Sequence, residues 1–373
     1  MKKRCLSFFL CAILAISLSG CKSNTNNTTT KDTTANDTTA QTTTSAPEET
    51  TASAQTTQSA DAEKAGDYFP ILENVRYVYQ GEGNEFLSYD QYVDYTDDTH
   101  MQLRINNGGT ETVKVIEVTD GTVKCVLSQA ETYYRENFLS KTDGTEEVLL
   151  MEPIEAGTSW TLSDGSTRTI TGVDVDIETP SGTYSAISVE TDEPSGTVTD
   201  YYAKGVGLVK TVRAANGSEI SSSLSEIQKD VPFTQTVRFF YPNASDEKIY
   251  YQDRTISFRT NDTTRTVLQN AYEEKIPGQP GTVFSDDTTV NSLYLNQDGM
   301  VYLDLSPSFV TGMNAGAEYE IMILQCVADT FGYYYGADKV ILTIDGSLYE
   351  SGHIKMEKGG ALSVQTDGTV EMA

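Results

Sequence analysis

Through most of residues 67–230, apolar and polar side chains alternate with a period of two in short runs. Turn sequences rich in Gly, Asn and Asp separate these runs, for example at 106–109, 164–165 and 216–217. Short alternating runs joined by such turns are typical of an antiparallel meander. We expect strands at 76–79, 100–105, 111–118, 122–127, 132–139, 147–151, 159–162, 166–175, 184–190, 198–203, 207–213 and 219–227. Ten or so such strands must curl or split. The pattern therefore predicts an all-β part over residues 67–230 with a strongly curved antiparallel sheet, such as a half-barrel.

A different pattern begins at Val231 and Pro232. Alternating runs are now mixed with apolar residues at helical spacing, which indicates an α+β part over residues 231–353. The expected elements are strands at 236–242 and 249–258, a helix from the capping residues 261–263 to Lys275, a hairpin at 288–305, a helix over 319–335 that is capped by Gly336, and strands at 340–344 and 347–349. An α+β sheet with two helices on one face would bury every apolar stripe. Residues 354–373 remain as a C-terminal extension.

Residues 1–20 have the pattern of a lipoprotein signal peptide. Positive residues at 2–4 precede an apolar run that is too short for a stable membrane span. The run ends in Leu-Ser-Gly-Cys at Cys21, which resembles the lipobox of bacterial lipoproteins. In those proteins the cysteine is diacylated, with palmitate-type chains, and becomes the mature N-terminus. An ordinary signal peptide with a chance cysteine is the alternative. We therefore expect lipidation at Cys21, which would hold the chain on the extracytoplasmic face of the cell membrane.

The residues that follow Cys21, up to residue 66, are Thr, Ser, Asn, Gln, Ala and Asp with almost no large apolar side chain. Such a segment cannot bury enough surface to offset its chain entropy. We therefore interpret residues 21–66 as a lipidated cysteine followed by a disordered linker. As a random coil the linker would span on the order of 40 Å and would hold the folded parts away from the lipid.

Several short motifs in the α+β part occur in an order that resembles the GerMN domain family. They are Phe240-Tyr241-Pro242 in the first strand, Asp304-Leu305-Ser306 after the hairpin, Asp329-Thr330 in the helix, and Asp345-Gly346 after the strand that starts at Val340. Asp329 stands where the family more often has asparagine, and Phe331 where it more often has leucine. The resemblance covers roughly residues 237–349. It implies a role in sporulation or spore germination, often as a lipoprotein, and a non-catalytic binding or assembly module of the cell envelope.

The charge of the chain narrows the range of partners. Lys and Arg number 26 against 54 Asp and Glu, so the net charge is −28. Phosphate binding needs clustered cations, which argues against a nucleic-acid partner.

Cys125 and Cys326 lie in separate apolar runs, and we expect two buried free thiols; a disulfide between the two parts is the alternative.

Candidate chemistry is sparse. Asp304 and Ser306 with Asp345 offer an acid and a nucleophile, but no histidine is near in sequence, so we interpret these side chains as turn-stabilising. His100 and His353, the only two histidines, each lie near a carboxylate in sequence. A metal site needs three or four converging ligands. The sequence therefore predicts no catalytic residue, no metal ion and no cofactor, and the chain is expected not to be an enzyme.

Three functions follow from these observations. The first is a membrane-anchored, non-catalytic lipoprotein that binds envelope or spore-assembly proteins or peptidoglycan. The alternative is an envelope carrier or sensor that holds a lipid or cell-wall glycan in the β part, which the tyrosines at 77–95 and 133–134 suggest. A pocket lined by those tyrosines would favour the alternative. The third is a wall hydrolase, which would clear a murein zymogram, and we expect no clearing.

Overall fold

The computed structural model of the protein describes residues 63–144, 146–215 and 217–372. The predicted signal peptide, the lipidation at Cys21 and almost all of the linker lie outside the described residues. In the described part, an all-β sheet precedes an α+β part, which confirms the predicted fold class.

Twelve strands form the first sheet, in the order β6-β5-β4-β3-β2-β1-β12-β11-β10-β9-β8-β7. Every pairing in it is antiparallel, as expected of a meander. Its strands are β1 (Val75–Glu82), β2 (Tyr89–Thr96), β3 (His100–Asn106), β4 (Glu111–Thr119), β5 (Thr122–Ala130), β6 (Glu147–Met151), β7 (Ser159–Thr161), β8 (Thr167–Thr179), β9 (Gly182–Glu193), β10 (Gly196–Ala203), β11 (Gly207–Ala215) and β12 (Ser218–Lys229). Two 3-10 turns, η1 (Ala65–Tyr68) and η2 (Glu85–Leu87), flank β1.

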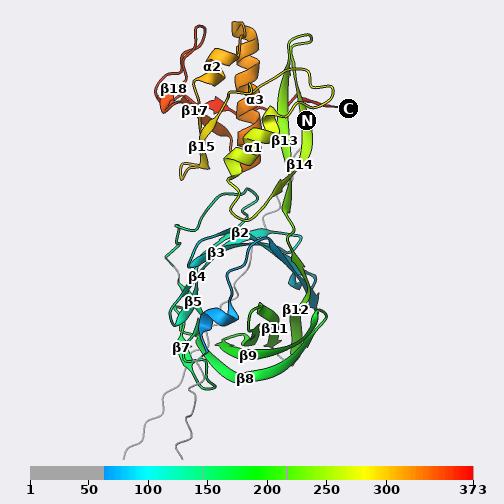
Figure 1. Cartoon of the computed structure of the whole chain (residues 1–373), viewed down its shortest axis with the longest axis vertical. Coiled ribbons are helices and arrows are strands. Elements are labelled where there is room, and N and C mark those ends of the chain that lie inside the picture. The colour runs from blue at the N-terminus through cyan, green and yellow to red at the C-terminus, as the bar shows by residue number, and fades with distance from the viewer. Residues whose placement is uncertain (1–62, 145, 216, 373) are drawn as a thin grey trace, which may run out of the picture. The chain divides into compact units, whose positions relative to one another are not determined.

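The sheet curls until its two end strands, β6 and β7, come close together (Figure 1). Side chains bridge this seam, because the indole nitrogen of Trp160 on β7 donates to the carbonyl oxygen of Val148 on β6 at 3.0 Å. Arg168 on β8 donates to the same carbonyl at 2.8 Å. The predicted curvature is therefore confirmed, and the sheet is nearly closed where a half-barrel was expected.

One predicted strand of this sheet is wrong. Residues 132–139 form a loop between β5 and β6. The carbonyl oxygens of Thr132 and Tyr134 accept hydrogen bonds from the Arg104 guanidinium, both at 2.8 Å, in place of a neighbouring strand. Phe138 packs with Val113 and Val115 in a separate cluster on the outer face of the sheet. The alternating apolar residues of this segment therefore cover an outer surface instead of extending the sheet.

The α+β part contains two sheets, where the pattern predicted one. The first has the order β13-β14-β20, and the second contains β15-β16-β17-β18 with β19 beside β17. The strands are β13 (Phe233–Asn243), β14 (Lys248–Phe258), β15 (Val290–Leu295), β16 (Val301–Leu305), β17 (Lys339–Ile344), β18 (Ser347–Leu348), β19 (Leu362–Ser363) and β20 (Val370–Glu371). The short strands β19 and β20 belong to the C-terminal extension, so that segment adds one strand to each sheet.

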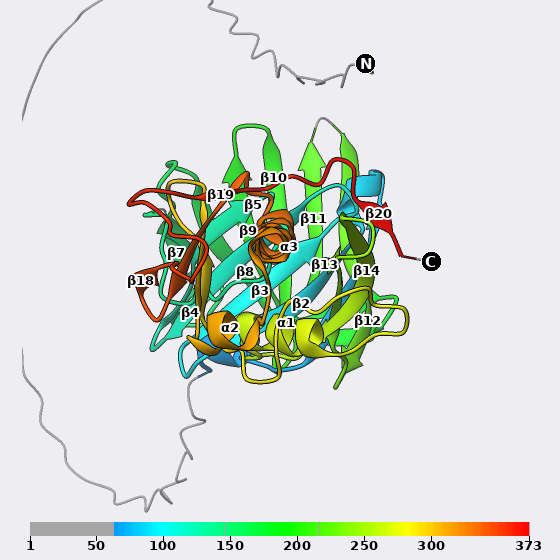
Figure 2. The same ribbon diagram turned by 90° about the horizontal axis from the view of Figure 1, so that it is seen from above.

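Three α-helices complete this part: α1 (Thr264–Glu273), α2 (Ser308–Gly312) and α3 (Ala317–Tyr335). Helix α3 lies between the two sheets; Figure 2 views it along its axis, with β13 and β14 on one side and β18 and β19 on the other. The helix ends where Gly336 adopts the left-handed conformation, with φ of 67°, as predicted. None of the helices in the described residues is long and apolar enough to cross a membrane.

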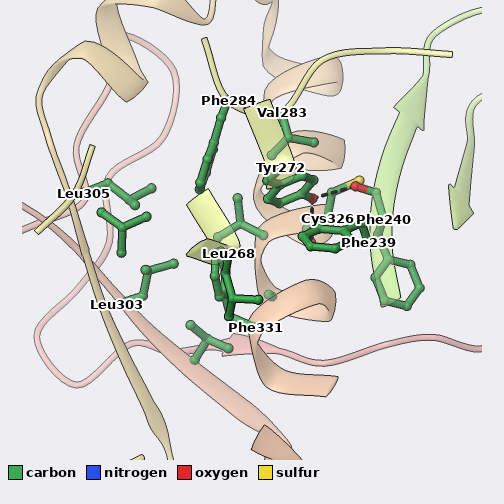
Figure 3. Packing of buried hydrophobic residues seen from close by; sticks show 14 of the residues in the cluster. Phe239, Phe240, Leu268, Tyr272, Val283, Phe284, Leu303, Leu305, Cys326 and Phe331 are labelled. Carbon is green, nitrogen blue, oxygen red and sulfur yellow. Dashed lines mark hydrogen bonds between the residues drawn. The ribbon is translucent and has the colours of Figure 1, made fainter. Parts of the chain in front are cut away.

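The core of the α+β part is aromatic. Tyr272 of α1 is buried at its centre, and its hydroxyl donates to the carbonyl oxygens of Phe240 at 2.5 Å and Cys326 at 3.3 Å (Figure 3). Phe284 and Phe331 stack beside it with ring centroids 6.1 Å apart. Because the one polar atom of this buried ring is hydrogen-bonded, the residue can fill the core without a desolvation penalty.

Candidate functional site

A cavity of about 250 Å³ lies inside the twelve-stranded sheet. The interior of the sheet holds two separate apolar clusters, one that includes Val93, Met101 and Leu103 and one that includes Tyr77 and Tyr79. The cavity is lined by members of both clusters, so it is the space that they leave between them. A mostly apolar cavity with a few polar groups is the usual form of a small-molecule site.

Tyrosine rings form a large part of the cavity wall. Tyr77 and Tyr79 alternate on β1 with outward residues, and their hydroxyls donate to the carbonyl oxygens of Val206 at 2.9 Å and Leu208 at 2.8 Å. These bonds hold the turn between β10 and β11 against β1. Tyr89 on β2 stacks on Tyr79 with centroids 4.4 Å apart and an interplanar angle of 19°. Burial raises the pKa of Tyr77 to about 12, so its hydroxyl stays protonated and can donate.

The polar end of the cavity contains Asp200. Asp200 on β10 pairs across the sheet with Thr211 on β11, and the Thr211 hydroxyl donates to Asp200 Oδ1 at 2.5 Å. Burial raises the pKa of the Asp200 carboxyl, although the hydrogen bond from Thr211 and the positive charge of Arg168 oppose that change. Burial raises the pKa of Tyr89 and Tyr202, and the negative charge of Asp200 raises it further. Both phenols line the same cavity as Asp200. The charge of Asp200 thus lies among aromatic rings.

Arg168 brings a second charged group to this end, and each of its three guanidinium nitrogens donates a hydrogen bond within the protein. Its guanidinium donates to Thr191 at 2.9 Å, to the carbonyl oxygen of Val148 at 2.8 Å and to Glu147 at 2.9 Å. Glu147 therefore balances Arg168 at the seam between β6 and β8. Lys114 on β4 also lines the cavity.

The predicted tyrosines divide into two groups. The cavity is lined by Tyr77, Tyr79 and Tyr89, which is what a carrier or sensor with its ligand in the β part predicts. Tyr92 and Tyr95 face away from it and contact the α+β part, because the Tyr92 hydroxyl donates to the carbonyl oxygen of Phe258 at 3.3 Å and the Tyr95 hydroxyl lies 3.0 Å from that of Thr264. The tyrosines at 133–134 lie in the outer loop, so they do not belong to the cavity.

Asp200, Thr211 and Arg168 are not among the residues that the sequence predicts for a site. Their proximity depends on which strands become neighbours, which the local pattern does not reveal. One signal was present, since Val198, Asp200 and Tyr202 occupy alternate positions of a strand whose other inward side chains are apolar or aromatic. A single carboxylate in such a row is expensive to bury and indicates either a partner or a ligand.

The motif residues of the α+β part fall into two places. Asp304, Leu305 and Ser306 lie at the end of β16, beside Asp345 and Gly346 at the end of the parallel strand β17. Asp304 accepts from the Thr343 hydroxyl at 2.5 Å, the Gly346 amide at 2.8 Å and the Asn291 amide group at 2.9 Å. Burial alone would raise the pKa of Asp304, but these hydrogen bonds outweigh it and lower the pKa. Ser306 Oγ accepts from the Thr289 amide at 2.9 Å. These contacts fix turns and leave no free nucleophile and base together.

The other two motif residues lie on α3. Asp329 is fully buried, and its Oδ1 accepts from the Gln325 side chain at 2.8 Å and from the Gln365 amide at 2.6 Å. The Thr330 hydroxyl accepts from the Phe240 amide at 3.1 Å and donates to the Tyr272 hydroxyl at 3.0 Å. Asp329 therefore holds the C-terminal extension against the helix, and Thr330 connects α3 to β13.

Comparison with known proteins identifies the α+β part. Residues 238–350 match the Germane protein family, which is described as "Sporulation and spore germination". This stretch is a GerMN, or Germane, domain. The matched residues contain both groups of motif residues, and they leave the twelve-stranded sheet outside the domain.

Solved structures similar to this chain include GerMN domains and exported proteins. The tandem GerMN domains of the sporulation protein GerM from Bacillus subtilis are 23% identical, over 35% of this chain and 46% of that chain, with a TM-score of 0.25. A Bacteroides fragilis exported protein with a YmcC-like fold is 13% identical, over 43% and 98% of the two chains, with a TM-score of 0.26. A structure described as a lipoprotein of Clostridium perfringens is 14% identical, over 35% and 87%, with a TM-score of 0.23. This chain thus spans less than half of the tandem GerM structure. No curated protein sequence matches the chain.

The two histidines are separated, one in the sheet and one just after the GerMN domain. His100 Nδ1 lies 3.0 Å from Asp97, as its position in sequence suggested. His353 pairs with Glu320 of α3 at 2.8 Å, whereas its sequence neighbour Glu350 pairs with Lys355. Within the described residues, no three His, Cys, Asp or Glu side chains gather as a metal site would require. Cys125 and Cys326 are both buried and free, as predicted.

Proposed function

We propose that this chain is a lipid-anchored, non-catalytic module of the cell envelope that acts in sporulation or spore germination. The GerMN domain at 238–350 carries this proposal, because the family that it matches is described by those two processes. The Leu-Ser-Gly-Cys sequence ending at Cys21 supports attachment to the extracytoplasmic face of the cell membrane. Envelope proteins, spore-assembly proteins or peptidoglycan are the expected partners of the GerMN domain.

The chemistry of the cavity supports binding over catalysis. Among the described residues that line it, none is a histidine, serine or cysteine. Acyl or glycosyl transfer by side chains needs a positioned nucleophile or a pair of carboxylates with a route to water. Glu147, the second carboxylate of the lining, is paired with Arg168. The proposal therefore includes no covalent step.

Replacement of Cys21 tests the anchor, and deletion of the gene tests the process. In the Cys21→Ala variant of the full chain, we expect the protein to leave the membrane fraction, because acylation requires the cysteine sulfur. The matched control is Cys11→Ala, which alters another cysteine of the same segment and should leave the protein in the membrane fraction. A deletion strain should sporulate or germinate less efficiently than its parent. Wild-type sporulation and germination in the deletion strain would contradict the proposal.

The second candidate is an envelope carrier or sensor that holds a small molecule in the twelve-stranded sheet. The cavity lined by Tyr77, Tyr79 and Tyr89 favours it. Native mass spectrometry of the full chain would show a copurified small molecule that is absent after Leu149→Trp, since that substitution fills the cavity. An unchanged spectrum would argue against this candidate.

A further inference from the structure

Asp200 has hydrogen-bonding capacity that the fold does not use. Among the described residues, its hydrogen-bond partner is Thr211, which donates to Oδ1. The side chain keeps some accessible surface although protein surrounds it, because that surface faces the cavity. A carboxylate in a low-dielectric site normally binds two or three donors, so Oδ2 can still accept from a ligand.

The neighbouring charges do not neutralise Asp200 by direct contact. Arg168 directs its donors to Thr191, Val148 and Glu147, and it acts on Asp200 only at longer range. Arg213, the other cation that lowers the pKa of Asp200, is paired with Glu193 at 2.7 Å. The negative charge at the polar end of the cavity is therefore available to a cationic ligand.

The rings around Asp200 suit a cation as well. Tyr79 and Tyr89 form a stacked pair that lines the cavity, and Tyr202, two residues after Asp200 on β10, lines it as well. The faces of aromatic rings carry partial negative charge and attract ammonium groups, most strongly away from water. A carboxylate with tyrosine rings beside it thus resembles the physical design of known ammonium sites. A carboxylate ligand would be repelled by Asp200, whereas Lys114 in the lining would attract it.

We propose that the cavity of the twelve-stranded sheet binds a small apolar amine, whose protonated amino group pairs with Asp200 and whose apolar body lies against Val93, Met101 and Leu103. This proposal rests on the second candidate function, an envelope carrier or sensor, and it names the class of ligand that such a protein would hold. A cavity of about 250 Å³ exceeds the roughly 150 Å³ that holds a benzene molecule. The fitting amines therefore have on the order of six to ten heavy atoms.

Three probes of equal length test the ligand class on the purified full chain. Hexylamine, hexanol and hexanoate are linear six-carbon chains that differ in the charge of the head group, and the carboxylate of hexanoate includes the sixth carbon. We expect calorimetric titration to give hexylamine an affinity at least tenfold above hexanol, with hexanoate weakest. Asp200→Asn should reduce hexylamine affinity at least tenfold and leave hexanol affinity within about twofold, since only the ammonium group needs the charge.

The controls separate charge, cavity and folding. Asp192→Asn removes an exposed carboxylate from β9 of the same sheet and should not change hexylamine affinity. Leu149→Trp should abolish binding of both hexylamine and hexanol by filling the cavity, and circular dichroism reports whether each variant is folded. Equal affinity for hexylamine and hexanol would overturn the ligand class while the carrier candidate stands. Preferred binding of hexanoate that is lost in Lys114→Gln would also overturn it. Absence of binding by all three probes would overturn both, whereas the sporulation phenotype and the Cys21 result are independent of these titrations.

Discussion

Asp329 and Asp200 are two carboxylates in low-dielectric surroundings that differ in their hydrogen bonds and in the space beside them. Asp329 in the GerMN domain uses one oxygen for two N–H donors, and its Oδ2 has no partner among the described residues. Asp200 in the sheet has one hydrogen bond and surface toward a cavity. Burial raises the pKa of both carboxyls, but only Asp200 has room beside it for a ligand.

Asp329→Asn should stabilise the chain at neutral pH. Burial raises the pKa of Asp329, so the folded chain holds this proton more tightly than the unfolded chain does. The contribution of Asp329 to stability is therefore greatest below the ordinary aspartate pKa and falls as pH rises through the raised value. Asparagine keeps the Oδ1 acceptor and carries no charge. We expect a gain of about 1 kcal/mol in urea denaturation at pH 7.5.

The same measurement at pH 4.5 checks the cause of that gain. The difference between Asp329→Asn and the native chain should shrink there, because the native carboxyl, whose pKa is raised by burial, is protonated to a greater extent than at pH 7.5. A matched control is Asp120→Asn in the exposed turn between β4 and β5, which should change stability little at either pH. A variant Asp329→Asn that is less stable than the native chain at pH 7.5 would contradict this prediction. It would mean that the contacts of the charged carboxylate offset the cost of burying it.

At the scale of elements, periodicity predicted most strands and both long helices, because each buries one face. The same rule produced the error at 132–139, where Tyr134 and Phe138 pack on the outer face of the sheet and Arg104 binds the loop carbonyls. The cavity was predictable only in its tyrosines on β1 and β2. The polar end of the cavity depends on strand pairing, because Asp200 and Thr211 lie on neighbouring strands and Arg168 lies at the seam where the sheet nearly closes. No local sequence pattern specifies either arrangement.

The loop between β5 and β6 contains Arg135, whose side chain forms several hydrogen bonds at the junction, that is, where the sheet contacts the GerMN domain. Arg135 is fully buried and donates to the carbonyl oxygens of Asp94 at 2.7 Å and Arg259 at 3.0 Å, and also to that of Asp262. Its guanidinium lies 4.0 Å from the centre of the Tyr95 ring. One residue of this loop therefore satisfies backbone groups on β2 and on the segment between β14 and α1.

Arg135→Met should be strongly destabilising. The substitution keeps an apolar chain of similar length but leaves several buried carbonyl oxygens without a donor, and each such loss costs about 1–3 kcal/mol. We expect a total loss of about 3 kcal/mol or more in urea denaturation. Arg213→Met is the matched control, because Arg213 forms an exposed pair with Glu193 whose loss should cost less than about 1 kcal/mol. Equal losses in the two variants would show that the Arg135 contacts contribute little.

At the scale of the molecule, the sheet and the GerMN domain share hydrogen bonds that are buried or partly buried. Besides Arg135, the Asn74 amide donates to the Thr260 hydroxyl at 2.8 Å, and the Thr260 amide donates to Asn74 Oδ1 at 3.0 Å. Strand β2 presents Tyr89 and Val93 to the cavity and Tyr92 to the GerMN domain. A ligand in the cavity would therefore contact a strand whose opposite face belongs to the junction.

These shared contacts predict that the sheet and the GerMN domain unfold together. Two probes separate them: Trp160, the single tryptophan of the chain, reports on the sheet seam, and circular dichroism at the helix band reports on the GerMN domain, which holds all three α-helices of the described residues. We expect both probes to follow one urea transition with the same midpoint. In Arg135→Met the two curves should separate, because the buried link between the parts is lost, whereas Arg213→Met should leave them coincident. Separate midpoints in the native chain would mean that the junction is too weak to couple the cavity to the GerMN domain.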